Sequence, residues 1–368
     1  MKVLISGGGT AGHINPGIAI AKYIKSKNPD CEILFVGTKR GLETTLVPRE
    51  NFELKTIKVK GFKRKLSKDT LVSVKELFQG IHEARVIIKE FKPNLVIGTG
   101  GYVCGPVVFN AARMKIPTLI HEQNAFPGVT NKLLSRFVDK VAISFKESEK
   151  FFKDKKKIVF TGNPIRGEML NIDRKAAKEK LGIEKDKSLV VIFGGSRGAE
   201  TINNTVSELI SQHRDEDKFH LLFATGEAQY DNIKSKLGSI NSKYIKVVPY
   251  IYNMGDVMAA ADLVVGRAGA ITLSELTALG VPSILIPSPY VTANHQEYNA
   301  RALETQEAAI VILEKNLNHK ILYDRINTLL KDANTLEKMA QNSKNMGITN
   351  ASEKIYDIID ELIKTNRK

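Results

Sequence analysis

Short apolar runs alternate with helical patterns along the first 163 residues of the chain. The run 2–6, rich in branched side chains, predicts a strand, and apolar residues three and four apart over 15–26 predict a helix with Pro16 in its first turn. Further apolar runs predict strands at 33–37, 95–98, 118–121, 141–143 and 158–160. This alternation predicts a parallel sheet whose strands are joined by crossover helices.

A second alternating series follows the segment 162–166, where the first pattern breaks. Its apolar runs predict strands within 188–204, 219–226, 245–251, 261–269 and 281–287. Two such series predict an α/β protein with two doubly wound, Rossmann-like domains that face each other across a cleft, with ligands beyond the C-terminal strand ends. The expected domains are residues 1–162, closed by a C-terminal helix at 349–368, and residues 165–348.

Each series begins with a strand that runs into a glycine-rich turn. Gly7, Gly9 and Gly12 match the pattern G-x-G-x-x-G, and residues 194–198 form a second glycine turn. Free N–H groups and the helix dipole at such turns favour an anion or a polar ligand. The glycines would make room for that ligand, although a tight turn without any ligand remains an alternative at this point.

The basic charge of the chain lies entirely in its first half. The net charge is +15, and residues 1–163 hold 29 Lys and Arg against 14 Asp and Glu, whereas residues 164–368 hold 26 of each. This asymmetry suggests that the first half meets a polyanion such as nucleic acid, anionic lipid or an acidic substrate.

Cysteine content and hydropathy limit the class of protein. Cys31 and Cys104 are the only cysteines, too few for a disulfide framework or a zinc cluster, and they indicate a reducing compartment. We expect no signal peptide, because a glycine turn interrupts the first apolar segment. No apolar stretch reaches the ~18 residues needed to cross a bilayer.

Six motifs that occur in order along almost the whole chain resemble those of one enzyme family. They are GGGTAGH, GTGGYVCGP, HEQNAFPGVTNK, TGNPIR, FGGSRGAETIN, and RAGAITLSELTALGVPSILIPSPY followed by NHQEYNA. Together they are similar to the MurG family of GT-B glycosyltransferases. The resemblance implies transfer of N-acetylglucosamine from UDP-N-acetylglucosamine to the undecaprenyl-linked lipid I, giving lipid II in peptidoglycan synthesis. Ala11 departs from the glycine that many members carry.

The late motif, RAGAITLSELTALGVPSILIPSPY, is expected to bind the donor diphosphate. Its small residues end a strand and open a helix, so a diphosphate can approach the N–H groups of Ala270, Ile271 and Thr272. Glu275, expected in the first turn, is implied by the resemblance to bind the ribose diol. The alternative for Glu275 is an acid placed favourably near the positive end of the helix dipole.

Four further residues complete the expected donor site, and all of them lie in the expected domain 165–348. Ser196 in the second glycine turn can donate to a phosphate oxygen, and Arg166 resembles a donor contact that would offset diphosphate charge. The resemblance implies that the main chain of Ile251, expected at a strand end, reads the uracil edge. Gln296 resembles the sugar-reading residue, since an amide both donates to and accepts from hydroxyl groups.

The acceptor side is expected in residues 1–162. An inverting sugar transfer needs a base for the acceptor hydroxyl, and His13, at the tip of the first glycine turn, suits that role near neutral pH. Its alternatives are helix capping or positioning of the sugar, and Glu122 is a competing base. Asn124 is the amide of this domain that matches Gln296, and Thr10, Ala11 and Gly12 would line the sugar side. His121 is expected to be structural.

No metal ion or other cofactor is expected. The only Asp-x-Asp triplet, Asp215 to Asp217, lies in a run of mixed charge between a helix and a strand. A solvated loop explains it better than a metal site, so a helix N-terminus and an arginine are expected to replace the metal at the diphosphate.

A basic, amphipathic segment in the first half predicts contact with an anionic membrane surface. Asp69 is the expected N-cap of its helix. The basic residues are Lys63, Arg64, Lys65 and Lys68, and the apolar stripe is Leu71, Val74, Leu77, Phe78 and Ile81. Each Lys or Arg near such a surface contributes ~1 kcal/mol. The alternative is an ordinary helix packed on the sheet. Together with a lipid-borne acceptor, the pattern predicts a peripheral protein on the cytoplasmic face of the membrane.

Three other functions are weighed against this one. An NADP-dependent oxidoreductase would explain the first glycine turn and use Arg40 for a 2′-phosphate, but it needs no second turn. A basic scaffold for nucleic acid or membrane lacks the motifs of known nucleic-acid binders, and no nucleic-acid partner is expected. Another GT-B transferase that moves a UDP-sugar to a lipid such as diacylglycerol is disfavoured only by the motifs.

Overall fold

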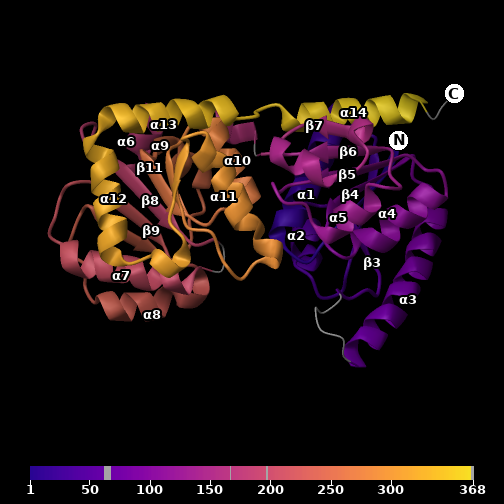
Figure 1. The fold of residues 1–368 in the computed structure, drawn as a ribbon, viewed down its shortest axis with the longest axis horizontal. Helices are drawn as coiled ribbons and strands as arrows, with labels where there is room; N and C mark the ends of the chain where they lie inside the picture. The colour runs from indigo at the N-terminus through magenta and orange to yellow at the C-terminus, as the bar shows by residue number, and fades with distance from the viewer. Residues whose placement is uncertain (62–67, 166, 196–197, 366–368) are drawn as a thin grey trace. The chain divides into compact units, whose positions relative to one another are not determined.

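The protein, described by a computed structural model, contains two compact units. The structure describes residues 1–61, 68–165, 167–195 and 198–365, without the side chains of residues 68–74 and 168. Unit 1 comprises Met1–Ile165 with Asn350–Lys368, and unit 2 comprises Arg166–Thr349 (Figure 1). Each unit is built on one parallel sheet, which confirms the predicted class of two doubly wound α/β units.

The sheet of unit 1 has the order β3-β2-β1-β4-β5-β6-β7. Ile5 of β1 pairs with Phe35 of β2 on one side and with Ile97 of β4 on the other. The strand order therefore reverses between β1 and β4, and this switch point is where such folds bind ligands. The strands are β1 (Lys2–Gly7), β2 (Glu32–Gly37), β3 (Glu53–Thr56), β4 (Leu95–Gly100), β5 (Thr118–Glu122), β6 (Lys140–Ile143) and β7 (Ile158–Phe160).

Helices cover both faces of this sheet, which explains why its central strands are apolar on both sides. Ile14 and Ile24 of α1 pack with Ile355 and Ile359 of α14 against one face, while α3 and α4 cover the other (Figure 1). The elements are α1 (Ala11–Lys27), α2 (Glu43–Arg49), α3 (Lys68–Phe91), α4 (Cys104–Arg113), α5 (Val129–Leu134), η1 (Lys146–Phe151), η2 (Lys155–Lys157) and α14 (Ala351–Thr365).

Unit 2 repeats the plan with the strand order β10-β9-β8-β11-β12-β13, so its switch point lies between β8 and β11. Its strands are β8 (Leu189–Phe193), β9 (His220–Ala224), β10 (Ile245–Val248), β11 (Leu263–Gly266), β12 (Ser283–Leu285) and β13 (Ala309–Val311). Ile192 and Val265 of its central strands form a core with α7, α8 and α12. The α-helices are α6 (Arg174–Leu181), α7 (Glu200–His213), α8 (Glu227–Leu237), α9 (Met254–Ala260), α10 (Ala270–Leu279), α11 (His295–Thr305), α12 (His319–Lys331) and α13 (Ala333–Met346), and the short 3-10 helices are η3 (Gly167–Asn171), η4 (Thr292–Asn294) and η5 (Glu314–Asn316).

Three element boundaries differ from the sequence prediction in ways that bear on function. Helix α1 begins at Ala11 rather than at 15, so Pro16 is buried inside the helix instead of in its first turn. Strand β10 ends at Val248, which leaves Ile251 in the following loop. Helix α3 begins at Lys68, so Asp69 lies within the helix and not at its N-cap.

Candidate active site

The glycine turn of unit 1 lies at the switch point between β1 and β4. The Gly8 N–H donates to the Gly100 carbonyl at 3.3 Å. A Cβ atom on Gly7 would lie 2.1 Å from Thr99 Oγ1, and one on Gly8 would lie 2.6 Å from Glu43 Oε1. The expectation that these glycines make room for a ligand is therefore wrong for Gly7 and Gly8, because side chains of the protein itself fill that space. At Gly12 the nearest atom to such a Cβ is 3.7 Å away.

His13 is the third residue of α1 and is held on two sides. Its Nδ1 lies 3.2 Å from the Gly8 carbonyl oxygen and 3.3 Å from Thr10 Oγ1. The opposite edge of the ring lies against Gly100, where a Cβ would come within 2.6 Å of His13 Cδ2. The half-buried imidazole is thus fixed in orientation at the switch point, as a general base must be.

Glu122, at the end of β5, is occupied by the protein's own donors. Glu122 is 1% exposed. Its carboxylate accepts hydrogen bonds from the backbone N–H groups of Asn124 and Gly128, each at 3.0 Å, and from Asn131 Nδ2 at 2.9 Å. Asn124 Nδ2 also donates to it at 3.2 Å. These contacts explain Glu122 as the residue that holds the β5–α5 loop, and they weaken its case as the base.

His121 has a structural environment. The residue is fully buried, and its Nε2 lies 3.0 Å from the Gly162 carbonyl and 3.2 Å from Ser144 Oγ. Burial lowers the pKa of the imidazole to about 4, because the charged form loses its hydration. His121 is therefore neutral at physiological pH and ties β5 to the segment that leaves unit 1.

In unit 2 the late motif lies at the switch point between β8 and β11. The first helical hydrogen bond of α10 runs from the Leu273 N–H to the Gly269 carbonyl at 3.0 Å, so the N–H groups of the three preceding residues have no acceptor within the helix. Ala270, Ile271 and Thr272 are these residues. Glu275, however, lies in the second turn and is 7% exposed, which corrects its expected place in the first turn.

Sequence reasoning missed Arg267 in the same motif. Arg267 follows β11, and its Nη2 lies 2.5 Å from Glu314 Oε2 while its Nη1 donates to the Ile286 carbonyl at 3.1 Å. The arginine thus fastens the loop before α10 to the ends of neighbouring strands. A charged residue directly after an apolar strand was the available signal.

The remaining donor residues are placed as follows. Gln296, in the first turn of α11, accepts a hydrogen bond from the Ser288 N–H at 2.9 Å, so its oxygen anchors the preceding loop. Ile251 is 4% exposed, so its side chain is buried. Arg166 and Ser196 lie outside the described residues.

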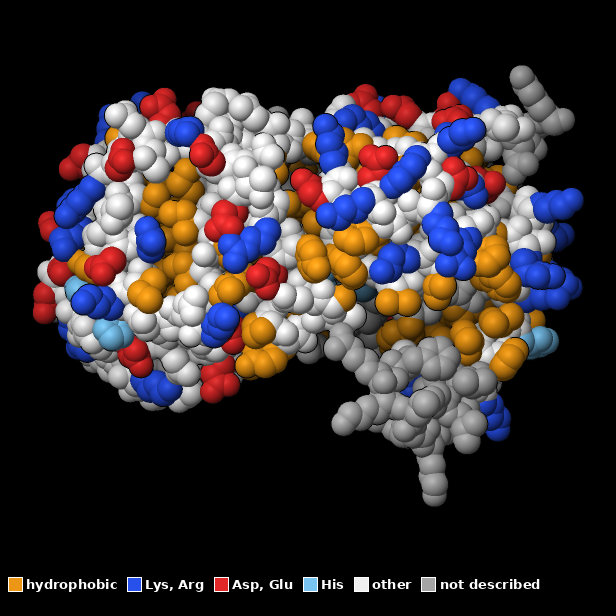
Figure 2. Space-filling model, in the orientation of Figure 1, with side chains coloured by type: hydrophobic (Ala, Val, Ile, Leu, Met, Phe, Trp, Pro, Cys, Tyr) orange, Lys and Arg blue, Asp and Glu red, His pale blue; other side chains and the backbone are white. Residues whose placement is uncertain are grey.

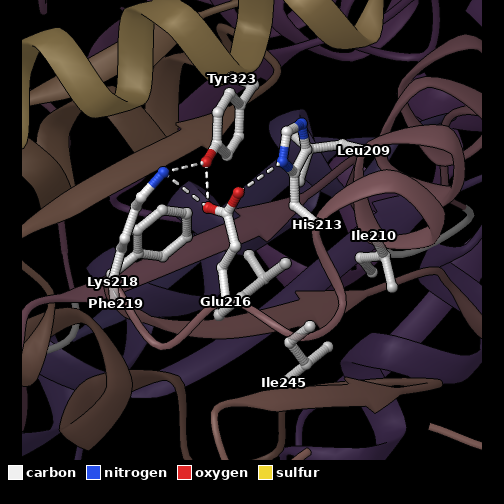
Figure 3. A pocket seen from close by; sticks show the side chains of 9 residues that line it. Leu209, Ile210, His213, Glu216, Lys218, Phe219, Ile245 and Tyr323 are labelled. Carbon is white, nitrogen blue, oxygen red and sulfur yellow. Dashed lines mark hydrogen bonds and ion pairs between the residues drawn. The ribbon is translucent and has the colours of Figure 1, made fainter.

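Glu216, the middle residue of the triplet Asp215 to Asp217, belongs to an ion-paired cluster (Figure 3). The Glu216 carboxylate accepts hydrogen bonds from Lys218 Nζ at 2.8 Å, from His213 Nδ1 at 3.0 Å and from the Tyr323 hydroxyl. Burial alone would raise the pKa of Glu216, but these three hydrogen bonds lower it to about 2. The cavity beside the cluster, about 20 Å³, has room for one water molecule. Within the described part of the chain, no group of three His, Cys, Asp or Glu is arranged to hold a metal ion.

Known proteins with the same architecture were found by sequence and by structure. The Glycosyltransferase family 28 N-terminal domain matches residues 3–143, and the family's C-terminal domain matches residues 189–362. The crystal structure of MurG from Acinetobacter baumannii shares 27% identity with the chain, with a TM-score of 0.80 over 98% of this chain and 99% of that one. The calicheamicin glycosyltransferase CalG4 shares only the fold, at 14% identity and a TM-score of 0.72.

Relatives of much higher identity decide the family. Over 364 residues, 99% of each sequence, the chain is 72% identical to the UDP-N-acetylglucosamine--N-acetylmuramyl-(pentapeptide) pyrophosphoryl-undecaprenol N-acetylglucosamine transferase of Acetivibrio thermocellus. The chain belongs to the MurG family. Another relative with the same name, from Ruminiclostridium cellulolyticum, is 58% identical over 99% of this chain and all of its own. The match to the family's C-terminal domain, residues 189–362, extends into α14, which belongs to unit 1 and packs on α1.

Proposed function

We propose that the chain transfers N-acetylglucosamine from UDP-N-acetylglucosamine to lipid I, which forms lipid II in peptidoglycan synthesis. The observation that carries this proposal is the 72% identity over 99% of both sequences to a transferase named for that reaction. A glycine-rich turn at the switch point of each unit supports it, since the reaction needs one site for the nucleotide sugar and one for the acceptor.

Unit 2 is the donor-binding unit in this proposal. The amide N–H groups at the start of α10 would receive the diphosphate, together with Ser196 and Arg166. Glu275 would bind the ribose, the main chain of Ile251 the uracil, and Gln296 the sugar. Because Gln296 Oε1 already accepts the Ser288 N–H, its Nε2 is the group that would donate to a sugar hydroxyl.

Unit 1 is the acceptor unit, with His13 as the general base. As the muramoyl hydroxyl attacks the anomeric carbon, its proton would pass to the imidazole, and UDP would leave with the bond electrons. Thr10, Ala11, Gly12 and Asn124 would contact the sugars. No metal is needed if the helix N-terminus and Arg166 offset the charge of the leaving diphosphate.

The deciding experiment measures transfer of labelled N-acetylglucosamine to a lipid I analogue by the full chain. Other UDP-sugars and diacylglycerol serve as controls for the donor and for the acceptor. Transfer to diacylglycerol but not to the lipid I analogue would favour a different lipid glycosyltransferase. A thermal shift with NADPH but not with UDP would favour the oxidoreductase.

Removal of the donor-reading side chains should raise the KM for the donor. We expect Glu275→Ala and Gln296→Ala each to lose ~1–3 kcal/mol of donor binding, since the partner group on the substrate is left without its hydrogen bond. Steady-state kinetics with varied UDP-N-acetylglucosamine measure the effect. Gln341→Ala, which removes an exposed amide that donates to Asn345 of α13, is the control. An unchanged donor KM in both variants would contradict the donor assignment.

A membrane-docking surface on unit 1 is part of the proposal. None of the helices in the described residues is long and apolar enough to cross a membrane. Unit 1 instead exposes large apolar side chains on α3 and around α5, with Phe78 68% exposed, Val129 62% and Phe137 52%. Helix α4 contacts both α3 and α5, and Phe137 meets Phe109 of α4 edge to face. On the visible face of unit 1, Lys and Arg are interspersed with such apolar side chains (Figure 2).

The predicted basic segment lies largely outside this description. The structure does not describe residues 63–65, and it describes only the backbone of Lys68. In the predicted stripe the side chains of Leu71 and Val74 are likewise not described, whereas Leu77 and Ile81 are half-buried and Phe78 is exposed. The helix thus packs on the sheet and still presents apolar surface.

Neutralising the basic segment should weaken binding to anionic membranes. Each replacement is expected to lose up to ~1 kcal/mol, and the remaining binding should depend less on salt. Co-sedimentation with phosphatidylserine vesicles, compared with phosphatidylcholine vesicles, measures the loss. The replacements to glutamine are at Lys63, Arg64, Lys65 and Lys68, and a control set replaces the exposed unit 2 residues Lys175, Lys185, Lys315 and Lys320. Equal losses in the two sets would contradict a docking site on unit 1.

A further inference from the structure

A buried carboxylate lies beneath the glycine turn of unit 1. Glu43, the first residue of α2, is 0% exposed and accepts three hydrogen bonds. Its Oε1 receives the N–H and the hydroxyl of Thr38, each at 2.8 Å, and its Oε2 receives the Gly9 N–H at 3.0 Å. Because all three neighbours donate, the group is held as an acceptor-only carboxylate.

Three residues around this carboxylate are glycines, because a side chain at any of them would clash with Glu43. A Cβ on Gly8 would lie 2.6 Å from Glu43 Oε1, one on Gly37 would lie 2.5 Å from its Cγ, and one on Gly41 would lie 1.9 Å from its Oε2. Gly8 lies in the turn after β1, Gly37 is the last residue of β2, and Gly41 lies in the turn that follows β2. Glu43 is therefore built into the site, although no step of the proposed reaction uses it.

One peptide group connects Glu43 to His13. The amide between Gly8 and Gly9 donates its N–H to Glu43 Oε2 at 3.0 Å, and its carbonyl oxygen lies 3.2 Å from His13 Nδ1. Donation to a carboxylate polarises an amide and makes its oxygen a stronger acceptor. A carbonyl oxygen can only accept, so a hydrogen bond at this 3.2 Å separation places a proton on Nδ1. The Thr10 hydroxyl, 3.3 Å from the same nitrogen, can also accept.

We propose that Glu43 is a positioning residue for His13, acting through the Gly8–Gly9 peptide to hold the imidazole in the tautomer with its proton on Nδ1. In that tautomer Nε2 carries the lone pair that takes a proton. The carboxylate also stabilises the imidazolium formed during turnover, as a directly bonded acid does in a catalytic triad. The effect on turnover rests on the proposed function, in which His13 is the base. The tautomer rests only on the contacts of Glu43 and His13 with the Gly8–Gly9 peptide.

Other titratable groups also line this turn. Tyr102 contacts the Gly9 position, where a Cβ would lie 3.8 Å from its ring. Cys104 Sγ lies 3.0 Å from the Gly100 carbonyl and 2.8 Å from the Ser6 carbonyl, to which it donates. Burial raises the pKa of the Cys104 thiol to about 11, so it stays neutral across the working range of an imidazole.

The test combines ¹⁵N NMR of histidine-labelled full-length protein with kinetics of Glu43→Gln. The ¹⁵N shifts distinguish protonated from unprotonated ring nitrogens, and His13→Asn assigns the signals. Glutamine has one acceptor oxygen, which suffices for the two Thr38 donors but turns an NH₂ toward the Gly9 N–H. Thr38→Val is the matched control, because it removes a buried hydrogen bond of Glu43 and keeps the link to Gly9.

We expect wild type and Thr38→Val to carry the proton on Nδ1 and Glu43→Gln to show a mixture of tautomers. Glu43→Gln should also lower kcat about 10- to 100-fold at unchanged donor KM. Its acid limb should move to lower pH, because the imidazolium loses a nearby negative charge. A proton on Nε2 in the wild type would overturn the proposal without any variant, as would a Glu43→Gln protein with wild-type tautomer and pH profile. Normal kcat in His13→Asn would reject His13 as base, and the NMR result would still decide the role of Glu43.

Discussion

Replacement of His13 with alanine is expected to lower kcat about 10²–10⁴-fold, the usual contribution of a general base, while the donor KM changes little. The imidazole is held at the switch point of unit 1 by Gly8 and Thr10, on the unit assigned to the acceptor. His13→Asn, which keeps a hydrogen-bonding side chain but cannot take the proton, should lose nearly as much. Activity of the wild type should fall on the acid side of the kcat profile as the imidazole becomes protonated.

The comparison with Glu122→Gln decides between the two candidate bases. Glu122 accepts the Asn124 and Gly128 N–H groups, so its replacement should loosen the β5–α5 loop and lower the melting temperature. We expect it to retain the acid limb of the kcat profile. If Glu122→Gln lost that limb while His13→Asn kept it along with normal kcat, Glu122 would be the base and His13 a positioning residue.

Replacement of Arg267 with methionine is expected to lower the free energy of unfolding by about 3–5 kcal/mol, because it leaves the Glu314 carboxylate buried without its cation. The side chains of Arg267 and Glu314 are 13% and 9% exposed, and Glu314 Oε1 also accepts the Thr201 hydroxyl at 3.0 Å. Among the described residues no hydrogen-bond donor is aligned with Glu314 Oε2, so its attraction to Arg267 is Coulombic. Thermal unfolding should register a drop of roughly 10 °C for a unit of this size.

An exposed ion pair of unit 2 provides the matched control. Arg301 pairs with Glu304, and their side chains are 45% and 35% exposed, so Arg301→Met should cost no more than about 1 kcal/mol. The double variant Arg267→Met, Glu314→Gln should recover part of the loss, because no unpaired charge remains buried. Equal destabilisation by Arg267→Met and Arg301→Met would contradict the importance of burial.

The sequence predicted the central strands of both sheets well because these strands are buried on both faces. Runs such as those of β1 and β8 are almost wholly apolar, and each ends in a glycine turn that marks the switch point. The edge strands β3 and β13 were missed. The first reads Glu-Leu-Lys-Thr, with no fully buried residue, and the second has three residues, so neither carries a periodic signal.

The site was less predictable than the fold, because contacts between distant segments decide it. The sequence singled out His13 from its place after a glycine turn, but it gave no reason to connect His13 with Glu43, thirty residues later on another element. The burial of Glu275 was not predicted either, since Glu275 was expected in the first turn of its helix, whereas α10 begins at Ala270 and places it in the second turn. Arg267 was passed over because its partner, Glu314, lies after a different strand.

The packing of α14 on unit 1 has a consequence for synthesis of the protein. Ile355, Ile358 and Ile359 complete a core that otherwise consists of α1, β1 and their neighbours, yet they follow the whole of unit 2 in the chain. Unit 2 is thus an insertion in unit 1, and it can fold on the ribosome while the earlier unit still exposes the isoleucines of α1 to water. A nascent chain should therefore expose this apolar surface for the time needed to translate about half of its length, so we expect unit 1 to need chaperones more than unit 2 does.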